Sequence, residues 1–409
     1  MTADGLVQGR LTDESIDLMR QRIGFPNPTI RTGILKDPWN MVCTADAIRR
    51  WALSFGDDNP FFTDPDYAAT TRWGQVIAPP AFEKSMGIDR SPTMELEFAR
   101  RTGKALRGVQ LFYSGGENFY HGPIVEGTKL YRSKYVESVT EKESNFGGRS
   151  VIVTNGLTLW DQNERVLVTG SELFVHTERR KVSSESKVAK DEPAFYTDEQ
   201  LAEIEAAYDN EYRRGADTLY FEDMHVGQSL PRMVKGPLTI TDLINLHMAS
   251  GWLTYGNPPY RLAYENRKVL RGFYSRDEFN AWDTVQRVHW DKDLAQRVGV
   301  PAIYDIGAVR QMMLCHYCTN WAGDDGWVYR TKFDLRNFNY MGDTTWLDGK
   351  VTEAYIDEQL GPRIEIEVTG ANQRGQQNLY GGATILVSSR KSGPVRLPET
   401  PPMPRYYAR

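Results

Sequence analysis

The chain of 409 residues lacks most of the features that mark secreted and membrane proteins. It has only three cysteines, and this odd, small number cannot form a disulfide framework, which favours a reducing compartment. No apolar run approaches the length of a membrane span, and no charged start followed by an apolar stretch indicates a signal peptide. We therefore expect a cytoplasmic protein that does not enter a membrane.

An excess of positive charge is also missing. Lysine and arginine number 49 against 54 acidic residues, and no basic stripe stands out, so we expect no nucleic-acid partner. Cys315 and Cys318 flank His316 in an apolar segment that is typical of a buried helix. A structural zinc site would need two more ligands, so we expect these cysteines to pack in the core and predict no metal.

The length predicts two domains, because one ordinary core rarely extends over so many residues. A polar stretch low in aromatics begins after residue 178, and Thr197 to Gln200 form a capping-box pattern that opens a charged helix ending near Tyr212. We therefore predict an N-terminal domain over 1–178, a linker over 179–215 and a C-terminal domain over 216–409.

Both predicted domains follow the same order of elements. Thr44 is a candidate N-cap for an amphipathic helix, a turn-rich segment follows, and a second helix is expected near Pro80. Alternating patterns then predict strands over 108–113, 129–136, 150–160 and 166–175. The second domain repeats this plan, with helices over 239–248 and 306–320 and strands over 327–334, 344–352, 363–369 and 382–388.

The repeat is visible in individual residues. When residues 60–68 are laid over the segment that ends at Ala295, Asp64 meets Asp291 and Phe62 meets His289. At the position of Phe62 and His289, only the second copy has an ionisable group, as expected of a duplicated enzyme with one working site. Two helices followed by an antiparallel sheet in each half predict an α+β tandem hot-dog fold, in which each sheet wraps a long central helix.

At these residues the chain resembles the MaoC-like dehydratases, the family that includes R-specific enoyl-CoA hydratases. The resemblance covers most of 30–178 and 218–390. The family motif runs Gly-Asp-x-Asn-Pro, then an apolar residue and His; residues 56–62 match it except at Phe62. The second half keeps the end of the motif from His289 to Asp291. Thr284 occupies the position of the expected Asp, and the nearest acid is Asp283.

The resemblance implies reversible hydration of an enoyl thioester. In the family an Asp and a His hold the water, and backbone N–H groups at the start of the long helix polarise the thioester carbonyl. Carried over, His289 is the His, Asp283 is the first candidate for the Asp, and Gly307 opens the central helix. No cofactor is implied, because acid–base chemistry at these positions needs none.

Other residues keep two interpretations. Asp57 is an alternative acid if it reaches the second half; otherwise Asp57 and Asn59 are turn and capping residues. Tyr304 and Asp305 precede Gly307, and Asp305 either orients His289 and shapes the pocket or caps the helix. An insertion over about 253–282 is rich in aromatics, which fits either a lid over a bulky acyl group or packing onto the sheet.

The resemblance further implies an acyl thioester substrate, a first half that shapes the acyl tunnel, and a homodimer or higher homo-oligomer. The carrier is CoA or an acyl carrier protein, and the lack of a basic docking patch favours acyl-CoA. Two other functions stay open. A hot-dog thioesterase would carry a carboxylate on or near the long helix, and the segment from His289 to Asp291 argues against it. A non-catalytic partner subunit would explain the missing Asp at the family spacing.

Overall fold

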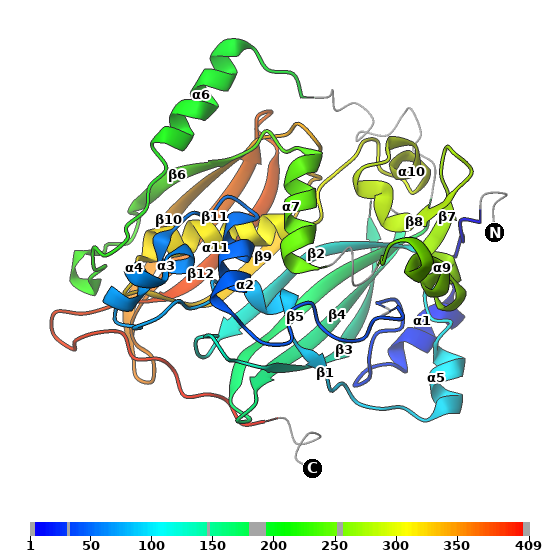
Figure 1. Ribbon diagram of the computed structural model, residues 1–409, viewed down its shortest axis with the longest axis horizontal. Helices are drawn as coiled ribbons and strands as arrows, with labels where there is room; N and C mark the ends of the chain where they lie inside the picture. Colours follow the sequence, from blue (N-terminus) through cyan, green and yellow to red (C-terminus); the bar gives the residue numbers. More distant parts are fainter. Residues whose placement is uncertain (1–4, 31–32, 145–147, 180–193, 252–256, 404–409) are drawn as a thin grey trace.

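The computed structural model describes residues 5–30, 33–144, 148–179, 194–251 and 257–403. Its elements follow one plan twice (Figure 1). The first half contains α1 (Asp13–Arg20), α2 (Ala45–Leu53), α3 (Pro60–Thr63), α4 (Pro65–Thr70), η1 (Phe82–Ser85), β1 (Ile88–Asp89), α5 (Leu96–Thr102), β2 (Gln110–Tyr120), β3 (Leu130–Ser144), β4 (Gly148–Asp161) and β5 (Val166–Thr177).

The remaining elements belong to the linker and the second half. They are α6 (Asp198–Asp209), η3 (Phe221–Asp223), β6 (Ser229–Lys235), α7 (Ile240–Ser250), α9 (Tyr260–Val269), η4 (Arg271–Phe273), β7 (Tyr274–Arg276), β8 (Trp282–Thr284), η5 (Val285–His289), α10 (Lys292–Arg297), α11 (Ala308–Ala322), β9 (Trp327–Leu335), β10 (Thr345–Asp357), β11 (Gly361–Asn372) and β12 (Gln377–Leu386).

The two expected sheets are joined into one sheet of ten strands, in the order β1-β3-β4-β5-β2-β9-β12-β11-β10-β6. The junction is an antiparallel pairing of β2 with β9, in which Gly115 lies opposite Asp334 and Phe119 opposite Arg330. On either side of the junction the strand order is mirrored, as expected for a duplicated unit. The fold is therefore the predicted tandem α+β arrangement, with its halves fused through backbone hydrogen bonds.

The second half contains the expected long central helix. The sheet formed by β9 to β12 curves around α11, which is buried along most of its length (Figure 1). Cys315 and Cys318 are unpaired and lie in the hydrophobic core, as predicted. Met313, Leu314 and Tyr317 of the same helix pack against the sheet core, so apolar burial on all sides holds α11 in place.

The first half lacks the helix that was expected near Pro80. Only the single 3₁₀ turn η1 forms there, because the backbone takes positive φ on both sides of it, 76° at Ala81 and 100° at Gly87, and a right-handed helix cannot continue through such residues. Phe82 is fully buried and packs edge-on against Trp51, with ring centroids 5.9 Å apart. The space beside Phe62 measures only about 40 Å³, and a separate cavity of about 630 Å³ lies at Gly56 and Asp58 of the degenerate motif, where α2 and α7 meet.

Capping residues confirm the duplication. Thr44 caps α2 and Thr239 caps α7 through their side chains, as the sequence predicts. Asp64 caps α4 and its repeat partner Asp291 caps α10 in the same way. The two halves therefore begin with the same local structures, and they diverge at the central helix.

The linker helix α6 extends from the rest of the fold in Figure 1. It begins after the capping box at Thr197, as predicted, but ends at Asp209 and not at Tyr212. Residues 180–193 lie outside the described residues, so the exact domain boundaries stay a prediction. None of the helices that the structure describes is long and apolar enough to cross a bilayer.

Candidate active site

A cavity of about 870 Å³ lies where the first-half sheet, the insertion and the start of α11 meet. Its apolar wall comes mainly from both sheets and from the segment before α10. That wall includes Leu106, Val109, Phe112, Tyr113, Ile152, Leu173, Phe174, Val285, Val288, Leu335, Phe338 and Tyr340. A space of this size and character suits an elongated, largely apolar ligand.

His289 lies on this wall at the end of η5. Its Nδ1 atom is 3.0 Å from the carbonyl oxygen of Tyr304, and the two rings meet edge to face with centroids 4.8 Å apart. Burial lowers the pKa of His289 to about 4, although the Tyr304 carbonyl opposes the shift. The imidazole is therefore neutral at physiological pH.

The segment from Tyr304 to Gly307 forms the adjoining part of the wall and leads into α11. No side chain caps this helix at Gly307, and the first N–H groups of a helix have no carbonyl acceptor within it. A Cβ atom on Gly307 would lie 2.8 Å from Leu335 Cδ1 and 3.0 Å from the Tyr113 carbonyl oxygen. Only glycine fits this close approach of the helix start to the first-half strand β2.

Asp305 is fully buried and its carboxylate forms a two-pronged ion pair with Arg310. Arg310 Nε is 2.9 Å from Oδ2, and its Nη2 is 3.3 Å from Oδ1. Nη1 of the same guanidinium donates to the carbonyls of Asn337 and Asn378 at 2.7 and 2.5 Å. Burial raises the pKa of Asp305, and Arg310 and Asn339 oppose this. The pair fixes the helix start to the neighbouring strands.

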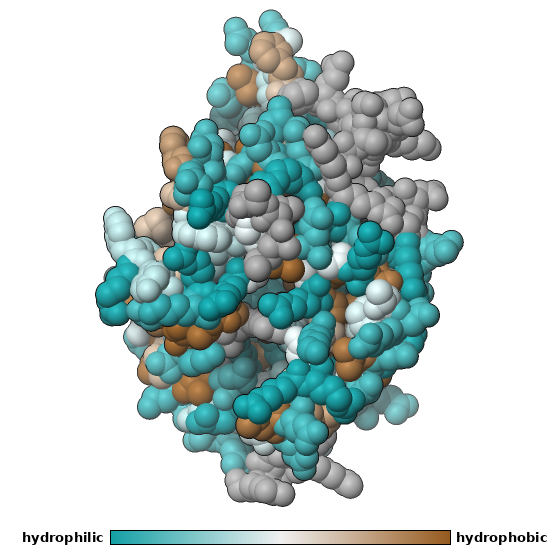
Figure 2. Space-filling view, turned by 90° about the vertical axis from the view of Figure 1, so that its right-hand side faces the viewer, coloured by the Kyte–Doolittle hydropathy of each residue, from teal (hydrophilic) through white to brown (hydrophobic). Residues whose placement is uncertain are grey.

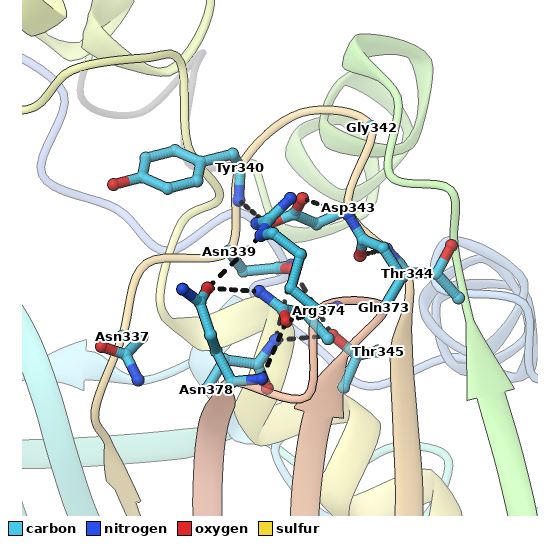
Figure 3. Close-up of polar contacts among 12 residues, drawn as sticks. Asn337, Asn339, Tyr340, Gly342, Asp343, Thr344, Thr345, Gln373, Arg374 and Asn378 are labelled. Atoms are coloured by element: carbon cyan, nitrogen blue, oxygen red, sulfur yellow. Dashed lines mark hydrogen bonds and ion pairs between the residues drawn. The ribbon is translucent and has the colours of Figure 1, made fainter. Parts of the chain in front are cut away.

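A polar network behind this pair holds the loop between β9 and β10 (Figure 3). Asn339 Nδ2 donates to Asp305 Oδ2 at 3.3 Å, and its backbone carbonyl accepts the Asp305 N–H at 2.8 Å. Asp343 accepts from Arg374 at 2.7 Å and from the Tyr340 N–H at 3.0 Å (Figure 3). The loop that carries Tyr340 to the cavity wall is thus tied to the sheet, and the Tyr304–Asp305 segment is tied to the loop.

The first candidate for the acid does not join this group. Asp283 lies in β8 and is absent from the described cavity wall. Its Oδ1 accepts the N–H of Thr284 at 2.6 Å. Asp283 pairs with Ser275 across β7 and β8, and the chain then turns into η5 before reaching His289. The acid at this spacing was therefore not brought to the cavity.

Asp57 and Asn59 lie in a different place, at the end of α2. Asn59 caps α3 and donates its N–H to Asp57 Oδ1 at 3.1 Å, which agrees with their interpretation as turn residues. The same oxygen is 3.5 Å from Nε2 of His316, and Glu211 Oε1 is 3.4 Å from that nitrogen. Burial raises the pKa of Asp57 to about 7, although the Asn59 N–H and Lys235 oppose the shift. None of these groups lines the large cavity.

The aromatic residues of the insertion are divided between the cavity wall, the protein interior and the surface. Phe273 reaches the cavity wall, as does the whole segment 268–273, whereas Tyr274 is buried against Asn266, to which its hydroxyl is bonded at 2.8 Å. Tyr260 and Tyr264 are exposed. Residues 252–256, which include the first part of the insertion, lie outside the described residues. Residues 268–273 of the insertion therefore line the cavity, whereas Tyr274 packs and Tyr260 and Tyr264 face solvent.

Two cationic wall residues, Arg310 and Arg179, were not predicted from the sequence. Arg310 could have been suspected, because it is the only charged residue in an otherwise uncharged helix, which signals a buried ion pair. Arg179 follows β5 at the start of the predicted linker, among other basic residues, and no pattern there distinguishes it.

Comparisons with known proteins concern the family and the fold of the chain. Residues 31–170 match the family described as FAS1-like, dehydratase domain region. A UPF0336 protein of Streptomyces avermitilis is 28% identical over 134 residues, which is 31% of this chain and 80% of the relative. A UPF0336 protein of Mycobacterium tuberculosis is 24% identical over 138 residues, which is 34% of this chain and 78% of the relative.

Two solved structures are similar over nearly the whole chain. A MaoC-like dehydratase gives a TM-score of 0.58 at 17% identity, covering 90% of this chain and all of the other. A MaoC domain protein dehydratase from Chloroflexus aurantiacus J-10-fl gives 0.50 at 12% identity, covering 92% and 96%. Identities this low establish the fold. Together with the family match, they confirm the expected resemblance to MaoC-like hot-dog dehydratases.

Proposed function

We propose that this MaoC-like double hot-dog chain catalyses the reversible addition of water to a 2-enoyl thioester. The observation that carries the proposal is the meeting of His289, the Tyr304 carbonyl and the start of α11 on one wall of a large apolar cavity. A base, a fixed tautomer and helix N–H donors are the parts that this chemistry needs.

His289 is the proposed base. A carbonyl oxygen can only accept, so the contact with Tyr304 keeps the imidazole hydrogen on Nδ1 and leaves the lone pair on Nε2. The lowered pKa keeps that lone pair available at neutral pH. Nε2 can then take a proton from a water molecule held in the cavity.

The start of α11 is the proposed oxyanion site. The N–H groups at Gly307 and Ala308 are among the first of the helix, and the positive end of the helix dipole favours negative charge there. They would stabilise the enolate oxygen that forms when hydroxide adds to the β-carbon. Imidazolium then returns its proton to the α-carbon, so that one water is added across the double bond and no net charge is left.

Asp305, and not Asp283, is the proposed supporting carboxylate. Asp305 follows Tyr304 directly, lies on the cavity wall and is held by Arg310. Its ion pair suits a positioning role, because it fixes the backbone that presents the Tyr304 carbonyl to His289. Asp57 is assigned no part in the reaction, since it lies with His316 away from the cavity.

The cavity supports a bulky acyl group carried as a CoA thioester. The absence of a long helix in the first half leaves the wall from Leu106 to Tyr113 free to line the cavity, and the segment 268–273 covers it as the proposed lid. Three free, buried cysteines fit a reducing cytoplasm. Assembly as a homodimer or higher homo-oligomer is carried over from the resemblance alone.

A thioesterase is disfavoured, because α11 contains no Asp or Glu along its length and the nearby Asp305 is already paired with Arg310. A non-catalytic partner subunit is the second candidate, and the position of Asp283 outside the cavity wall is the observation in its favour.

The direct test follows the loss of enoyl absorbance for a panel of short, long and aryl enoyl-CoA thioesters. Wild type should hydrate at least one, and His289→Ala should lose about 10²–10⁴-fold in kcat. His225→Ala is the matched control, because His225 is exposed and lies off the cavity wall. No hydration of any substrate by folded wild type would favour the partner-subunit alternative.

A further inference from the structure

The wall of the large cavity is strongly cationic, although the chain as a whole has a net charge of −5. The described lining residues include two carboxylates, Asp305 and Asp334. The cationic side chains among them are Arg107, Lys142, Arg179, Lys268, Arg271, Arg310 and Arg336.

Several of these cations have protein partners. Arg310 is paired with Asp305, Arg336 lies 3.4 Å from Asp334, and Lys268 lies 2.9 Å from Glu265. Arg107, Lys142 and Arg271 are exposed at the surface, where water screens them. The face that carries α9 and α1 is predominantly hydrophilic, with only small, separate hydrophobic patches (Figure 2). Arg179 belongs to neither group.

Arg179 is a partly buried cation whose guanidinium is incompletely bonded. Its Nη1 donates to the Val7 carbonyl oxygen at 2.6 Å, and its buried Nε has no hydrogen-bond partner. No carboxylate of the described residues lies within ion-pair distance of it. Burial accordingly lowers the pKa of Arg179 to about 10. Leaving a desolvated guanidinium without a counter-charge is costly, so a guanidinium with no acidic partner among the described residues favours an anion supplied by a bound ligand.

The position of Arg179 relates it to the proposed reaction centre. Arg179, Tyr304 and His289 all line the same cavity, and the Tyr304 ring meets His289 edge to face with centroids 4.8 Å apart. An anion at Arg179 would belong to the same ligand that His289 acts on.

We propose that Arg179 binds an anionic oxygen group of the thioester substrate, and thereby makes the cavity selective for anionic ligands. This rests on the proposed function for the identity of the ligand as a thioester. A guanidinium suits both possible sources of the group, a phosphate of the CoA carrier and a carboxylate on the acyl chain, because it presents paired N–H donors to either.

The test is equilibrium binding by calorimetry, which does not require turnover. Four probes separate the sources: CoA, pantetheine, crotonyl-pantetheine and glutaconyl-pantetheine, the last being an enoyl thioester with a terminal carboxylate. They are titrated into wild type, Arg179→Gln and Arg179→Lys. Arg232→Gln is the matched control, since Arg232 is an exposed arginine of β6 that is paired with Asp348 of β10.

If phosphate is the group, wild type binds CoA about 10- to 100-fold more tightly than pantetheine, and Arg179→Gln removes most of that preference. If an acyl carboxylate is the group, wild type prefers glutaconyl-pantetheine to crotonyl-pantetheine by a similar factor, and Arg179→Gln removes most of that preference. Arg179→Lys should keep part of either preference, because it retains the charge. The control should keep all of it.

The proposal is overturned if wild type shows neither preference, or if Arg179→Gln leaves both binding ratios unchanged. Should Arg179→Gln fail to fold by circular dichroism, the wild-type ratios and Arg179→Lys decide the matter. Binding that depends on Arg179, in a protein that hydrates no enoyl thioester, would support the anion site and reject the proposed function. Hydration of an enoyl thioester, combined with binding that does not depend on Arg179, would support the proposed function and reject the anion site.

Discussion

The Nδ1 atom of His289 lies 3.0 Å from the carbonyl oxygen of Tyr304, and this contact fixes which ring nitrogen carries the hydrogen. Asp305, the next residue after Tyr304, is held by Arg310 and Asn339, so the carbonyl cannot rotate freely. The proposed base thus has its tautomer set by a backbone carbonyl. This arrangement differs from the Asp–His pair that the sequence suggested, and it has consequences for the pH dependence.

The first prediction concerns pH. His289 must be neutral to act as a base, and burial lowers its pKa to about 4, so kcat/KM should fall only as pH drops through about 4. The profile should be flat from pH 5.5 to 7.5, a range in which an unperturbed histidine would titrate. Initial rates across this range, with circular dichroism to confirm folding, would check it. A midpoint near 6.5 would contradict the assignment of His289 as a buried base.

The second prediction concerns Gly307. Replacing it with alanine places a Cβ 3.0 Å from the backbone carbonyl oxygen of Tyr113, which cannot rotate away as the Leu335 side chain can, so the start of α11 is expected to shift from its N–H positions. A displacement of this kind should lower kcat about 10²-fold. Gly122→Ala is the matched control, because its Cβ would meet only Leu167 Cδ2 at an ordinary 3.4 Å. Equal activity of the two variants would remove the helix start from the mechanism.

The third prediction separates the candidate acids. Asp305→Asn leaves Arg310 without its counter-charge and should lower the free energy of unfolding by about 3–5 kcal/mol, with a loss of activity. Asp283→Asn should change both by little, because its carboxylate is partly exposed and off the cavity wall. Chemical denaturation and hydration rates for both variants would measure this. Loss of several orders of magnitude in Asp283→Asn alone would restore Asp283 as the acid.

The fourth prediction concerns Asp57. Its pKa is about 7 in the folded protein against an ordinary 3.8, so the folded state binds a proton more tightly than the unfolded state. This contribution to stability is complete below pH 3.8 and is lost as pH rises through 7. The ionised, buried carboxylate then costs roughly 4 kcal/mol, from three pKa units at 1.36 kcal/mol each.

Asp57→Asn should therefore raise Tm at pH 8 relative to wild type, and the gain should shrink toward pH 5. Asp58→Asn, at the exposed neighbouring position, is the control. Hydration activity should be retained in both, since neither residue is assigned a part in the reaction. A loss of stability at pH 8 would instead mean that the ionised Asp57 is favourably paired with its neighbours His316 and Lys235.

Much of the fold could be predicted from local patterns. Thr44 and Thr239 mark helix starts, because their own side chains cap the helices. The alternation of apolar and polar residues along a strand tells which side chains face the core, so a few neighbouring residues are enough for both predictions. The prediction of a second helix near Pro80 was wrong. Ala81 and Gly87 both have positive φ in the structure, and only one 3₁₀ turn forms between them.

The candidate site was predictable only in part. His289, Tyr304, Asp305 and Gly307 are close in sequence and meet as expected on one wall. Arg310 depends on the Asn378 carbonyl, 68 residues away, and Arg179 on Val7, 172 residues away. Pairings over such distances follow from the assembled sheet, and no spacing rule in one sequence reveals them.

The seam between β2 and β9 also decides which chains can associate. Glu117 lies opposite Lys332 at its centre, and Arg330 reaches Glu117 at 2.5 Å. If two first halves paired through β2 about the same centre, Glu117 would face its own copy, and two second halves would oppose Lys332 with Lys332. Like charges directly across a strand pair repel. The charge on the edge strand of each half is thus complementary to the other half and repels a copy of itself. Because both halves belong to one chain, they are always made in equal numbers.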